Sequence, residues 1–410
     1  MKFIVTGGAS IKNNLGDQAM IFTLIEFLRR KYDDVEITVF DEDAYFSKEL
    51  VNNFNFKILP DIPMIHKIKK INRILYLLYK LLGKGVRFSN DIEEEIIREY
   101  ETCDYIFQIA GFGLSSQMEY KNVLSRLWDL AYAKKLKKKI TMLPQSIGPF
   151  DYSGFKKILF SHYLRKLINY PDFVLCREKM GRDILMDFGC AKAEIEYDIV
   201  VSRPNKLDYA FIGRYEKRKP PEYDIDKEKD VVLVPNFRFL NHIGLEELCG
   251  IYKEIISECI RITNGKVYIF NHEMKDDRDL SYAIYERFSN DNRVILIDSG
   301  FDCLDVEEFF KNFAMGIATR WHSYVHMIRT GLPAVIIGWA EKYLETASDF
   351  KQMDNLFDIR RLTNEKDILQ AVKRVYNNRA DIAGKIVERE NEIKKTFCLE
   401  RITKHIAREE

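Results

Sequence analysis

The residues of this chain best suited to chemistry are an arginine and a histidine two positions apart, Arg320 and His322. The arginine is a permanent cation, and the histidine can give or take a proton near neutral pH. An apolar run at 315–319 predicts a buried strand before them, and a short helix is predicted after them. Ligands bind at the carboxyl ends of strands in such parallel units, so we expect both side chains in a functional site. A helix-capping or core-satisfied pair is the alternative interpretation.

Three more polar side chains follow strands in the same half of the sequence. Arg238, His272 and Lys342 each come a few residues after an apolar run. Because the carboxyl ends of neighbouring parallel strands meet at one edge of a sheet, we expect these groups to lie near Arg320. Several cationic groups at adjacent strand ends predict a site for an anionic substrate.

The first half of the chain begins with a strand and a glycine-bearing turn that holds Asn14, Gly16 and Asp17. Glycine allows close backbone approach, and the free N–H groups at a helix start attract anions or hydroxyls. The dinucleotide fingerprint G-x-G-x-x-G and the P-loop pattern are both absent, which argues against NAD and P-loop nucleotides. Asp17 is either a functional carboxylate or the N-cap of the following helix.

Polar or glycine-rich turns also follow three later strands of this half. They contribute Gly111, Gly113, Gln145, Ser146, Arg177 and Glu178. Polar side chains at the end of an apolar strand are typical of a binding surface. The two glycines could serve only to form a turn, and an internal ion pair is the alternative interpretation of Arg177 and Glu178.

Apolar runs alternate with helical patterns through most of the sequence, which predicts parallel βαβ construction. The first series of expected strands is 3–6, 36–40, 57–59, 105–110, 140–144, 173–176 and 194–199. The second series is 231–235, 266–271, 293–297, 315–319 and 334–338. Expected helices include 17–30, 120–136, 154–168, 179–188 and 245–262. The fold class is therefore α/β, with two Rossmann-like doubly wound domains that face each other across a cleft.

A stretch rich in charge and proline separates the two strand series and marks the domain boundary. We expect an N-terminal domain at 1–205, a linker at 206–229 and a C-terminal domain at 230–376. The highly charged remainder, 377–410, predicts a C-terminal helix that packs back across the interface.

Composition agrees with two cores and excludes several classes of protein. A chain of 410 residues suits two domains, and no apolar run approaches the ~20 residues of a membrane helix. The sequence begins without a signal-peptide pattern, so we expect a cytoplasmic location. Seven scattered cysteines without a CxxC pattern favour reduced, buried thiols over disulfides or a zinc site. The net charge of +1 argues against nucleic-acid binding.

One segment departs from this balance of charge. Residues 63–88 contain no acidic residue and seven basic ones, namely Lys67, Lys69, Lys70, Arg73, Lys80, Lys84 and Arg87. Apolar residues recur there at near-helical spacing, which predicts one or two basic amphipathic helices. Such a segment either contacts an anionic membrane peripherally, at its inner face, or covers a sheet face or lines an acceptor groove.

The ordered set of motifs resembles the polysaccharide pyruvyl transferase family. The resemblance is carried by Asn14-Leu-Gly16-Asp17, Gly111–Gly113, Gln145-Ser-Ile-Gly148-Pro149, Arg177-Glu178, Arg320-Trp-His322 and Gly331-x-Pro333. It implies a GT-B-like fold and transfer of pyruvate from phosphoenolpyruvate to two hydroxyls of a sugar, which makes a cyclic ketal. The acceptor is then a polysaccharide or a lipid-linked oligosaccharide. The chain departs from the family pattern at its Ala-Gly-Phe-Gly turn, at Trp321 and in the basic segment, which bears on the acceptor more than on the donor.

The chemistry of that reaction assigns roles to the candidate residues. The carboxylate and phosphate of phosphoenolpyruvate need cations, which Arg320, Arg238, Lys342 and His272 supply on the C-terminal, donor side. His322 is the expected acid, and Asp17 or Glu178 would orient or deprotonate sugar hydroxyls. The expected acceptor-binding set, on the N-terminal side, is Asn14, Gly16, Gly111, Gly113, Gln145, Ser146, Arg177 and Glu178.

No metal and no cofactor are expected beside phosphoenolpyruvate as co-substrate, and the sequence does not determine the oligomeric state. Two alternatives stay open from the sequence. The first is a GT-B glycosyltransferase that uses a nucleotide sugar, and the second is a non-catalytic glycan-binding relative.

Overall fold

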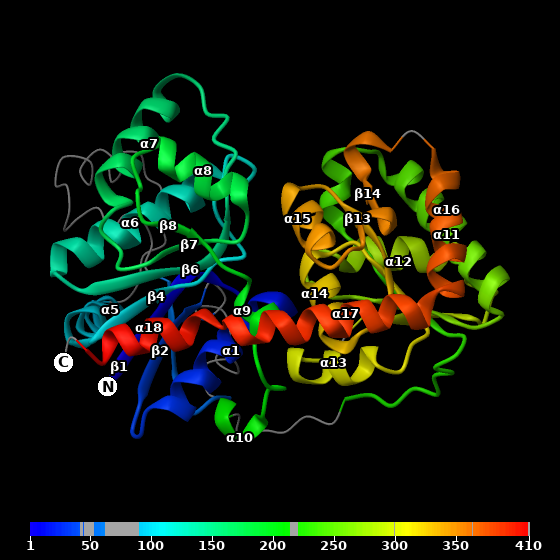
Figure 1. Cartoon of the computed structure of the whole chain (residues 1–410), viewed down its shortest axis with the longest axis horizontal. Coiled ribbons are helices and arrows are strands. Elements are labelled where there is room, and N and C mark those ends of the chain that lie inside the picture. Colours follow the sequence, from blue (N-terminus) through cyan, green and yellow to red (C-terminus); the bar gives the residue numbers. More distant parts are fainter. Residues whose placement is uncertain are drawn as a thin grey trace.

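The computed structural model describes residues 1–41, 44, 53–61, 90–213, 220–298, 300–362 and 364–408. These residues form two parallel β-sheets covered by helices, one in each half of the chain (Figure 1). The basic segment 63–88, for which membrane contact is predicted, lies outside the described residues. No helix among the described residues is both long enough and apolar enough to cross a membrane.

The first sheet has the strand order β3-β2-β1-β4-β6-β7-β8, and β5 pairs with β6. Its strands are β1 (Lys2–Ala9), β2 (Glu36–Asp41), β3 (Lys57–Pro60), β4 (Tyr105–Gln108), β5 (Phe112–Leu114), β6 (Lys139–Ile147), β7 (Val174–Cys176) and β8 (Ala193–Ile195). The pairing is parallel, with Ile4 of the central strand opposite Thr38 and Ile106. Helices cover both faces, which explains why these strands read as continuous apolar runs.

The second sheet has the order β11-β10-β9-β12-β13-β14. Its strands are β9 (Val231–Val234), β10 (Val267–Phe270), β11 (Val294–Ile297), β12 (Met315–Ala318), β13 (Ala334–Gly338) and β14 (Leu356–Asp358). This is the strand order of a Rossmann domain. Strands are added on one side of β9 first and then on its other side, and the point where this order switches creates a crevice at the strand ends. The predicted α/β fold with two Rossmann-like, doubly wound domains is confirmed.

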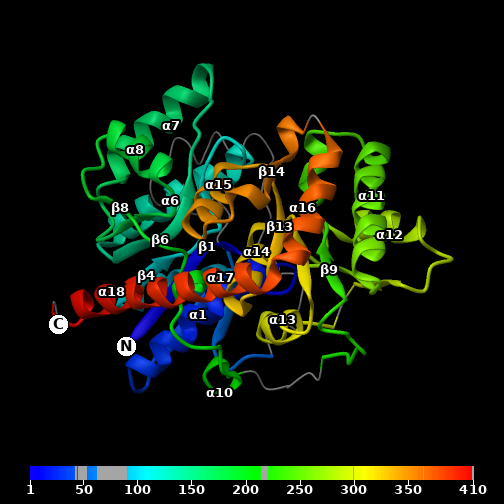
Figure 2. The ribbon, with the colours of Figure 1, turned by 45° about the vertical axis from the view of Figure 1, so that its right-hand side comes forward.

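Helices connect the strands and cover both sheets (Figures 1 and 2). Those of the first half are α1 (Leu15–Lys31), α5 (Asn90–Thr102), α6 (Tyr120–Leu136), α7 (Gly154–Leu167) and α8 (Lys179–Asp187). Those of the second half are α11 (Leu245–Thr263), α12 (Arg278–Glu286), α13 (Cys303–Phe310), α14 (Trp321–Thr330), α15 (Glu341–Asp349) and α16 (Glu365–Asn377). Two short helices, α9 (Ile199–Ser202) and α10 (Tyr209–Ile212), lie between the two series.

The expected strand at 194–199 is wrong in its second half. The strand β8 ends at Ile195, and helix α9 begins at Ile199. Asp198 is the N-cap of α9 and accepts a hydrogen bond of 2.8 Å from the backbone N–H of Val200. An N-cap aspartate stops extended structure because its side chain replaces a missing helical acceptor. The short strands β5 and β14 were not expected from the sequence.

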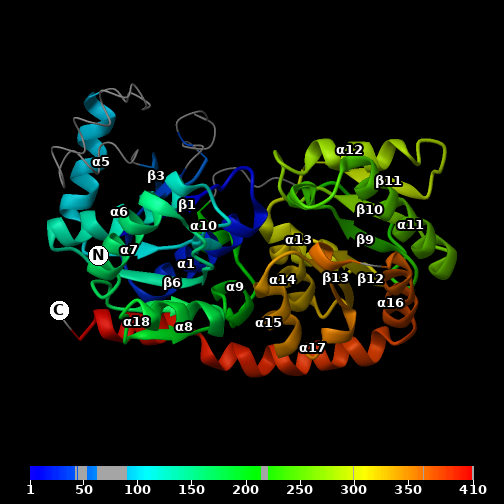
Figure 3. The same ribbon diagram turned by 90° about the horizontal axis from the view of Figure 1, so that it is seen from above.

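The charged C-terminal stretch forms two helices, α17 (Arg379–Ile393) and α18 (Cys398–Ile406), separated by a 3₁₀ turn at Lys394–Thr396. They run along one side of both domains and return the chain to the first (Figures 1 and 3). There the ring centroids of Phe397 and Phe27 lie 5.3 Å apart, and Arg401 donates a hydrogen bond to Glu196 at 2.8 Å.

The two halves share a continuous apolar core, to which α1, α9 and α14 contribute Leu24, Ile199 and Val325. Polar contacts reinforce this junction. Arg203 donates two hydrogen bonds, of 2.8 and 2.9 Å, to Glu307 of α13. The walls of any site between the domains are therefore held by packing and by paired charges.

Candidate active site

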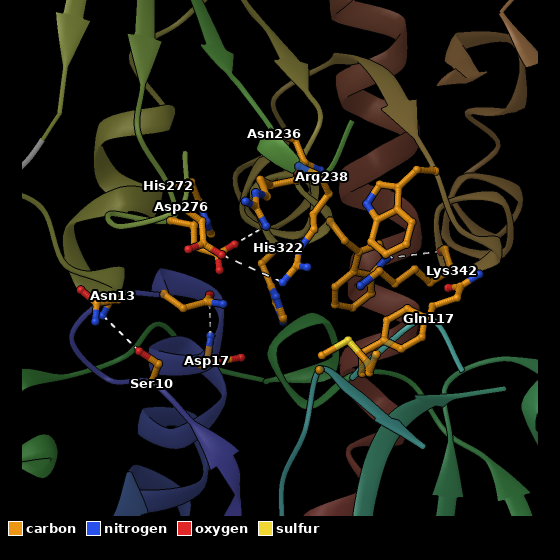
Figure 4. Close-up of a pocket in the computed structure, with 18 of the residues that line it drawn as sticks. Ser10, Asn13, Asp17, Gln117, Asn236, Arg238, His272, Asp276, His322 and Lys342 are labelled. Atoms are coloured by element: carbon orange, nitrogen blue, oxygen red, sulfur yellow. Dashed lines mark hydrogen bonds and ion pairs between the residues drawn. The ribbon is translucent and has the colours of Figure 1, made fainter. Parts of the chain in front are cut away.

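A pocket of about 370 Å³ lies between the two domains (Figure 4). The first domain contributes loops that follow β1 and β4 and the start of α6, and the second contributes the loops that follow β9, β10, β12 and β13. The pocket is thus bounded by carboxyl ends of strands in both sheets, where doubly wound domains bind ligands. Its lining includes these predicted site residues: Asn14, Asp17, Gly111, Arg238, His272, Arg320, His322 and Lys342.

The turn after β1 closes one end of the pocket. Asn14 forms an antiparallel bridge with Glu273 of the second domain, and Met274 donates its backbone N–H to Asn13 at 2.8 Å. The side chain of Asn14 caps α1 by accepting hydrogen bonds from the N–H groups of Gly16 and Asp17, at 2.9 and 3.1 Å. The N-cap interpretation of Asp17 is therefore wrong. Its carboxylate lies in the first turn of α1 and lines the pocket.

His322 lies in the first turn of α14 and points across the pocket towards the first domain (Figure 4). A Cβ atom on Gly16 would come within 2.2 Å of His322 Nδ1, so only glycine allows this approach. A Cβ on Gly111 would lie 3.6 Å from His322 Cε1 and 3.8 Å from Asp17 Oδ1. The two glycines thus bring the imidazole and the Asp17 carboxylate to one end of the pocket.

The imidazole of His322 is neutral in this environment. Burial, and then the nearby charges of Arg177 and Lys342, lower its pKa well below the usual value. Its Nε2 is buried and has no hydrogen-bond partner among the described residues. An anion bound in the pocket would oppose those cations and raise the pKa, so binding of an anionic ligand favours protonation of His322.

Arg320 lines the same pocket, but carboxylates of the second domain already bind its guanidinium. Its Nε donates to Asp277 at 2.8 Å, its Nη2 donates to the other oxygen of that group, and its Nη1 pairs with Glu273. Asp277 is fully buried and also accepts the backbone N–H of Phe237 at 2.9 Å. Burial raises the pKa of Asp277 and of Glu273, and Arg320 opposes this shift. The cation of Arg320 is therefore compensated before any ligand binds.

Lys342 has a different environment. Its Nζ lies 4.8 Å from the ring centroid of Phe112 and 5.5 Å from that of Trp321. Among the described residues it forms no ion pair with a carboxylate. Burial, followed by the charge of Arg177, lowers the pKa of Lys342 to about 7. Arg238 is also weakly paired, because the one ion pair that it forms among the described residues is with Asp276, at 4.0 Å.

Six of the eight predicted acceptor-binding residues do not line the pocket. Arg177 donates to the Gly111 carbonyl at 2.9 Å, pairs with buried Asp198 and lies 4.6 Å from the Trp321 ring centroid. These six are Gly16, which packs against His322, and Gly113, Gln145, Ser146, Arg177 and Glu178, which lie behind the pocket wall. Their contact with an acceptor stays a prediction.

These buried residues support the wall through specific contacts. The Ser146 hydroxyl donates to Glu178 at 2.7 Å, and burial raises the pKa of that carboxyl. Gly113 packs directly on the Gln145 amide, because a Cβ there would overlap Gln145 Oε1. The expected internal pair between Arg177 and Glu178 is replaced by the pair of Arg177 with Asp198.

Sequence reasoning missed the carboxylates that hold Arg320 and the aromatic rings at the junction of the two domains. Glu273 directly follows His272, so the same strand-end signal could have found it. Asp277 lies further from the strand and gives no such signal. Phe112 and Trp339 stack across the two domains with ring centroids 6.1 Å apart. Their proximity depends on the arrangement of the domains and has no local pattern.

Comparison with known proteins adds a family to this geometry. The chain is 21% identical to the amylovoran biosynthesis protein AmsJ of Erwinia amylovora, over 94% of each chain. Among solved structures it is similar to the S. aureus protein MnaA with UDP, at a TM-score of 0.62, 15% identity and coverage of 99% and 95% of the two chains. It is also similar to the Anabaena protein Alr3699/HepE with UDP, at a TM-score of 0.56, 10% identity and coverage of 99% and 98% of the two chains. These structures share the fold, which is the GT-B arrangement.

The sequence profile of the polysaccharide pyruvyl transferase family matches residues 14–341. That range includes the turn of Asn14, the Arg320-Trp-His322 motif and every other residue of the pocket from the second domain except Lys342 and Tyr343. Because the match covers most of the chain, the protein belongs to the polysaccharide pyruvyl transferase family.

Proposed function

We propose that the protein transfers pyruvate from phosphoenolpyruvate to two hydroxyls of a sugar, in a polysaccharide or a lipid-linked oligosaccharide, and forms a cyclic ketal. The observation that carries this proposal is the composition of one pocket. Weakly paired cations, among them Lys342 and Arg238, lie in it with a neutral imidazole, His322, and a carboxylate from the opposite domain, Asp17.

The anionic donor accounts for the two cations. Phosphoenolpyruvate carries a carboxylate and a phosphate, and Lys342 and Arg238 can each bind one of them by charge-assisted hydrogen bonds. His272 adds a buried imidazole near this end of the pocket, with a pKa lowered by burial and by His326 and Arg320. Arg320 fixes Glu273 and Asp277 and thereby shapes the wall against which the donor lies.

The reaction needs proton transfers at two places. One sugar hydroxyl adds to C2 of the donor, C3 gains a proton and becomes a methyl group, and the C2–O bond to phosphate breaks. The second hydroxyl then bonds to C2 and closes the ketal. One hydroxyl proton is retained on the methyl group and the other leaves with phosphate, so the atoms balance.

His322 and Asp17 fit these transfers. His322 gains a proton when an anion lies beside it and can deliver that proton to C3 or to the departing phosphate. Asp17 lies on the first-domain side, where the sugar would enter, and can accept a hydroxyl proton. Phe112 and Trp339 offer aromatic faces to the sugar ring at the same junction.

The test is phosphate release from phosphoenolpyruvate across a panel of glycans and lipid-linked oligosaccharides. We expect release only with a matching acceptor, whose mass then increases by one pyruvic acid less one water. The His322→Ala variant serves as the control for contaminating phosphatase. The proposal fails if no acceptor supports release while nucleotide sugars are consumed.

Nucleotide-sugar transfer is the second candidate, favoured by the two UDP complexes among the similar folds. Thermal unfolding separates the two, because a ligand that binds the folded state raises the melting temperature. We expect phosphoenolpyruvate to raise it and uridine or guanosine diphosphate to leave it unchanged. A non-catalytic relative would bind a glycan without releasing phosphate.

A further inference from the structure

Helix α7 exposes two large apolar side chains at its first two turns. Phe155 is 75% exposed and Ile158 is 68% exposed, the highest values among the described large apolar residues. The helix lies at the end of the first domain that is remote from α17 and α18 (Figure 1). Water solvates such side chains poorly, and two of them on adjacent turns form a patch that calls for a partner.

The patch belongs to an amphipathic helix that is firmly attached to the domain. Phe160, Leu164 and Leu167 bury one face of α7 against the core of the first domain. At helical spacing, Phe155 and Ile158 fall on the opposite face, which is directed away from the protein. The patch is therefore held outward by the fold.

The charged residues of α7, at its two ends, are all basic. Lys156, Lys157, Arg165 and Lys166 are exposed on α7, and no acidic residue occurs from Tyr152 to Pro171. Asp151, just before this stretch, is engaged by the Ser116 hydroxyl at 3.5 Å. A helix with an exposed apolar pair, whose charged residues are all basic, has the composition of helices that rest on an anionic lipid surface.

We propose that Phe155 and Ile158 insert into an anionic bilayer while the basic side chains of α7 bind lipid phosphates, so that α7 is a membrane contact site. A second copy of this chain fits less well, because a symmetric contact through this face would bring cations against cations.

The contacts between α7 and the pocket suggest a role for membrane binding in presenting the acceptor. This role rests on the proposed function. Tyr120 donates to the Lys156 carbonyl at 2.9 Å, and Ser116 donates to the Pro149 carbonyl at 2.8 Å. These bonds join the start of α7 to the loop whose Gln117 lines the pocket. A lipid-linked acceptor held by the membrane would therefore be presented on the first-domain side.

The test is co-sedimentation of the full-length protein with vesicles of phosphatidylcholine, with and without phosphatidylglycerol. The wild type should bind only the anionic vesicles, and added salt should weaken this binding. Phe155→Ser combined with Ile158→Ser should lower the binding constant for anionic vesicles about tenfold, because the apolar side chains that insert are lost. Lys156→Gln combined with Lys157→Gln should weaken binding as well.

Matched controls lie on the second domain, where Leu245 and Leu344 are 46% and 45% exposed. Leu245→Ser with Leu344→Ser, and Lys366→Gln with Lys373→Gln, should leave vesicle binding unchanged. The proposal is overturned if the wild type does not bind anionic vesicles. It is also overturned if the Phe155/Ile158 variant binds as the wild type does, including the case in which only neutralising 63–88 abolishes binding.

The vesicle assay contains neither donor nor sugar, so it does not depend on the proposed function. The Phe155/Ile158 variant should also retain wild-type turnover of a water-soluble acceptor, because the altered side chains do not line the pocket. Loss of binding with intact turnover supports the membrane contact specifically.

Discussion

Arg320 and Lys342 line the same pocket from the same domain, but they differ in whether a carboxylate neutralises their charge. The guanidinium of Arg320 is held by two carboxylates of its own domain, Glu273 and Asp277. The amine of Lys342 faces the rings of Phe112 and Trp321 instead. A paired cation strengthens the wall, whereas an unpaired one attracts an anion. Residue type alone therefore does not identify the ligand-binding cation.

The difference has an energetic basis. Removing one partner of a buried ion pair leaves an uncompensated charge. Loss of Arg320 from its pairs with Glu273 and Asp277 therefore lowers the stability of the fold. Burial and the nearby charge of Arg177 lower the pKa of Lys342 to about 7, although the carboxylates of Glu178 and Asp17 oppose this shift from a distance. An anionic ligand would supply the missing partner. The comparison predicts that Arg320 governs stability and Lys342 governs donor affinity.

The largest effect on activity is expected at His322, which lines the same pocket. His322→Ala should lower turnover by roughly 10²- to 10⁴-fold, the usual range for loss of a general acid or base. Donor binding should change little, because the neutral imidazole is not the main partner of the anion. Steady-state rates with direct titration of phosphoenolpyruvate separate the two quantities, and wild-type turnover in this variant would contradict the role.

Arg320→Met should lower the free energy of unfolding by about 3–5 kcal/mol, because Asp277 and Glu273 are left buried without their cation. Urea denaturation measures this loss. Adding Asp277→Asn to the variant should restore part of the stability, since one uncompensated charge is then removed. If Arg320→Met unfolds like the wild type and loses only donor affinity, the contrast drawn with Lys342 is wrong.

Lys342→Met should weaken binding of phosphoenolpyruvate roughly 10- to 100-fold, the equivalent of about 1.5–3 kcal/mol for a charge-assisted hydrogen bond. Its stability should stay close to that of the wild type or increase, because the substitution removes a poorly solvated charge. Calorimetric titration gives the dissociation constant, and the exposed residue Lys366 supplies the control as Lys366→Met. Equal affinities of the wild type and Lys342→Met would rule out the proposed contact.

The smallest effect is a dependence of donor affinity on pH. The folded-state pKa of Lys342 is about 7, so the free enzyme loses this positive charge as the pH rises above that value. Affinity for phosphoenolpyruvate should then fall by at most about tenfold per pH unit. Phosphate monoesters are fully ionised in this range, because their second pKa is about 6. Lys342→Met should abolish the slope.

The same lowered pKa has a consequence for stability. Between about pH 7 and the unfolded value near 10.4, the unfolded chain binds one more proton at Lys342 than the folded chain does. Stability from this group therefore rises with pH through that window. Below pH 7 both states are protonated, and the cost of burying the charge is greatest. In urea denaturation, the free energy of unfolding of the wild type should therefore increase from pH 7 to pH 9 relative to that of Lys342→Met.

Much of the fold could be predicted because strands that are covered on both faces read as apolar runs. Strands such as β1, β9 and β12 followed directly from this pattern, and the polar residues after them line the pocket. The end of β8 was missed because one aspartate, Asp198, starts a helix inside an apolar run. A local cap signal overrode the apparent strand.

The partners of the candidate residues could not be predicted in the same way. Asp277 reaches Arg320 from the start of α12, 43 positions away in sequence. Gln145 and Ser146 end up behind the wall because the strand β6 continues to Ile147 and buries them. Such contacts depend on how elements pack, and strand-end position alone carries no information about them.

A co-crystal structure of the His322→Ala variant with phosphoenolpyruvate is the most direct test of the central claim, because this variant should bind the donor without turnover. We predict a carboxylate or phosphate oxygen within hydrogen-bond distance of Lys342 Nζ, a second anionic group near Arg238, and an unchanged pair between Arg320 and Asp277. A donor bound to Arg320 in place of Asp277, or bound outside this pocket, would contradict the account.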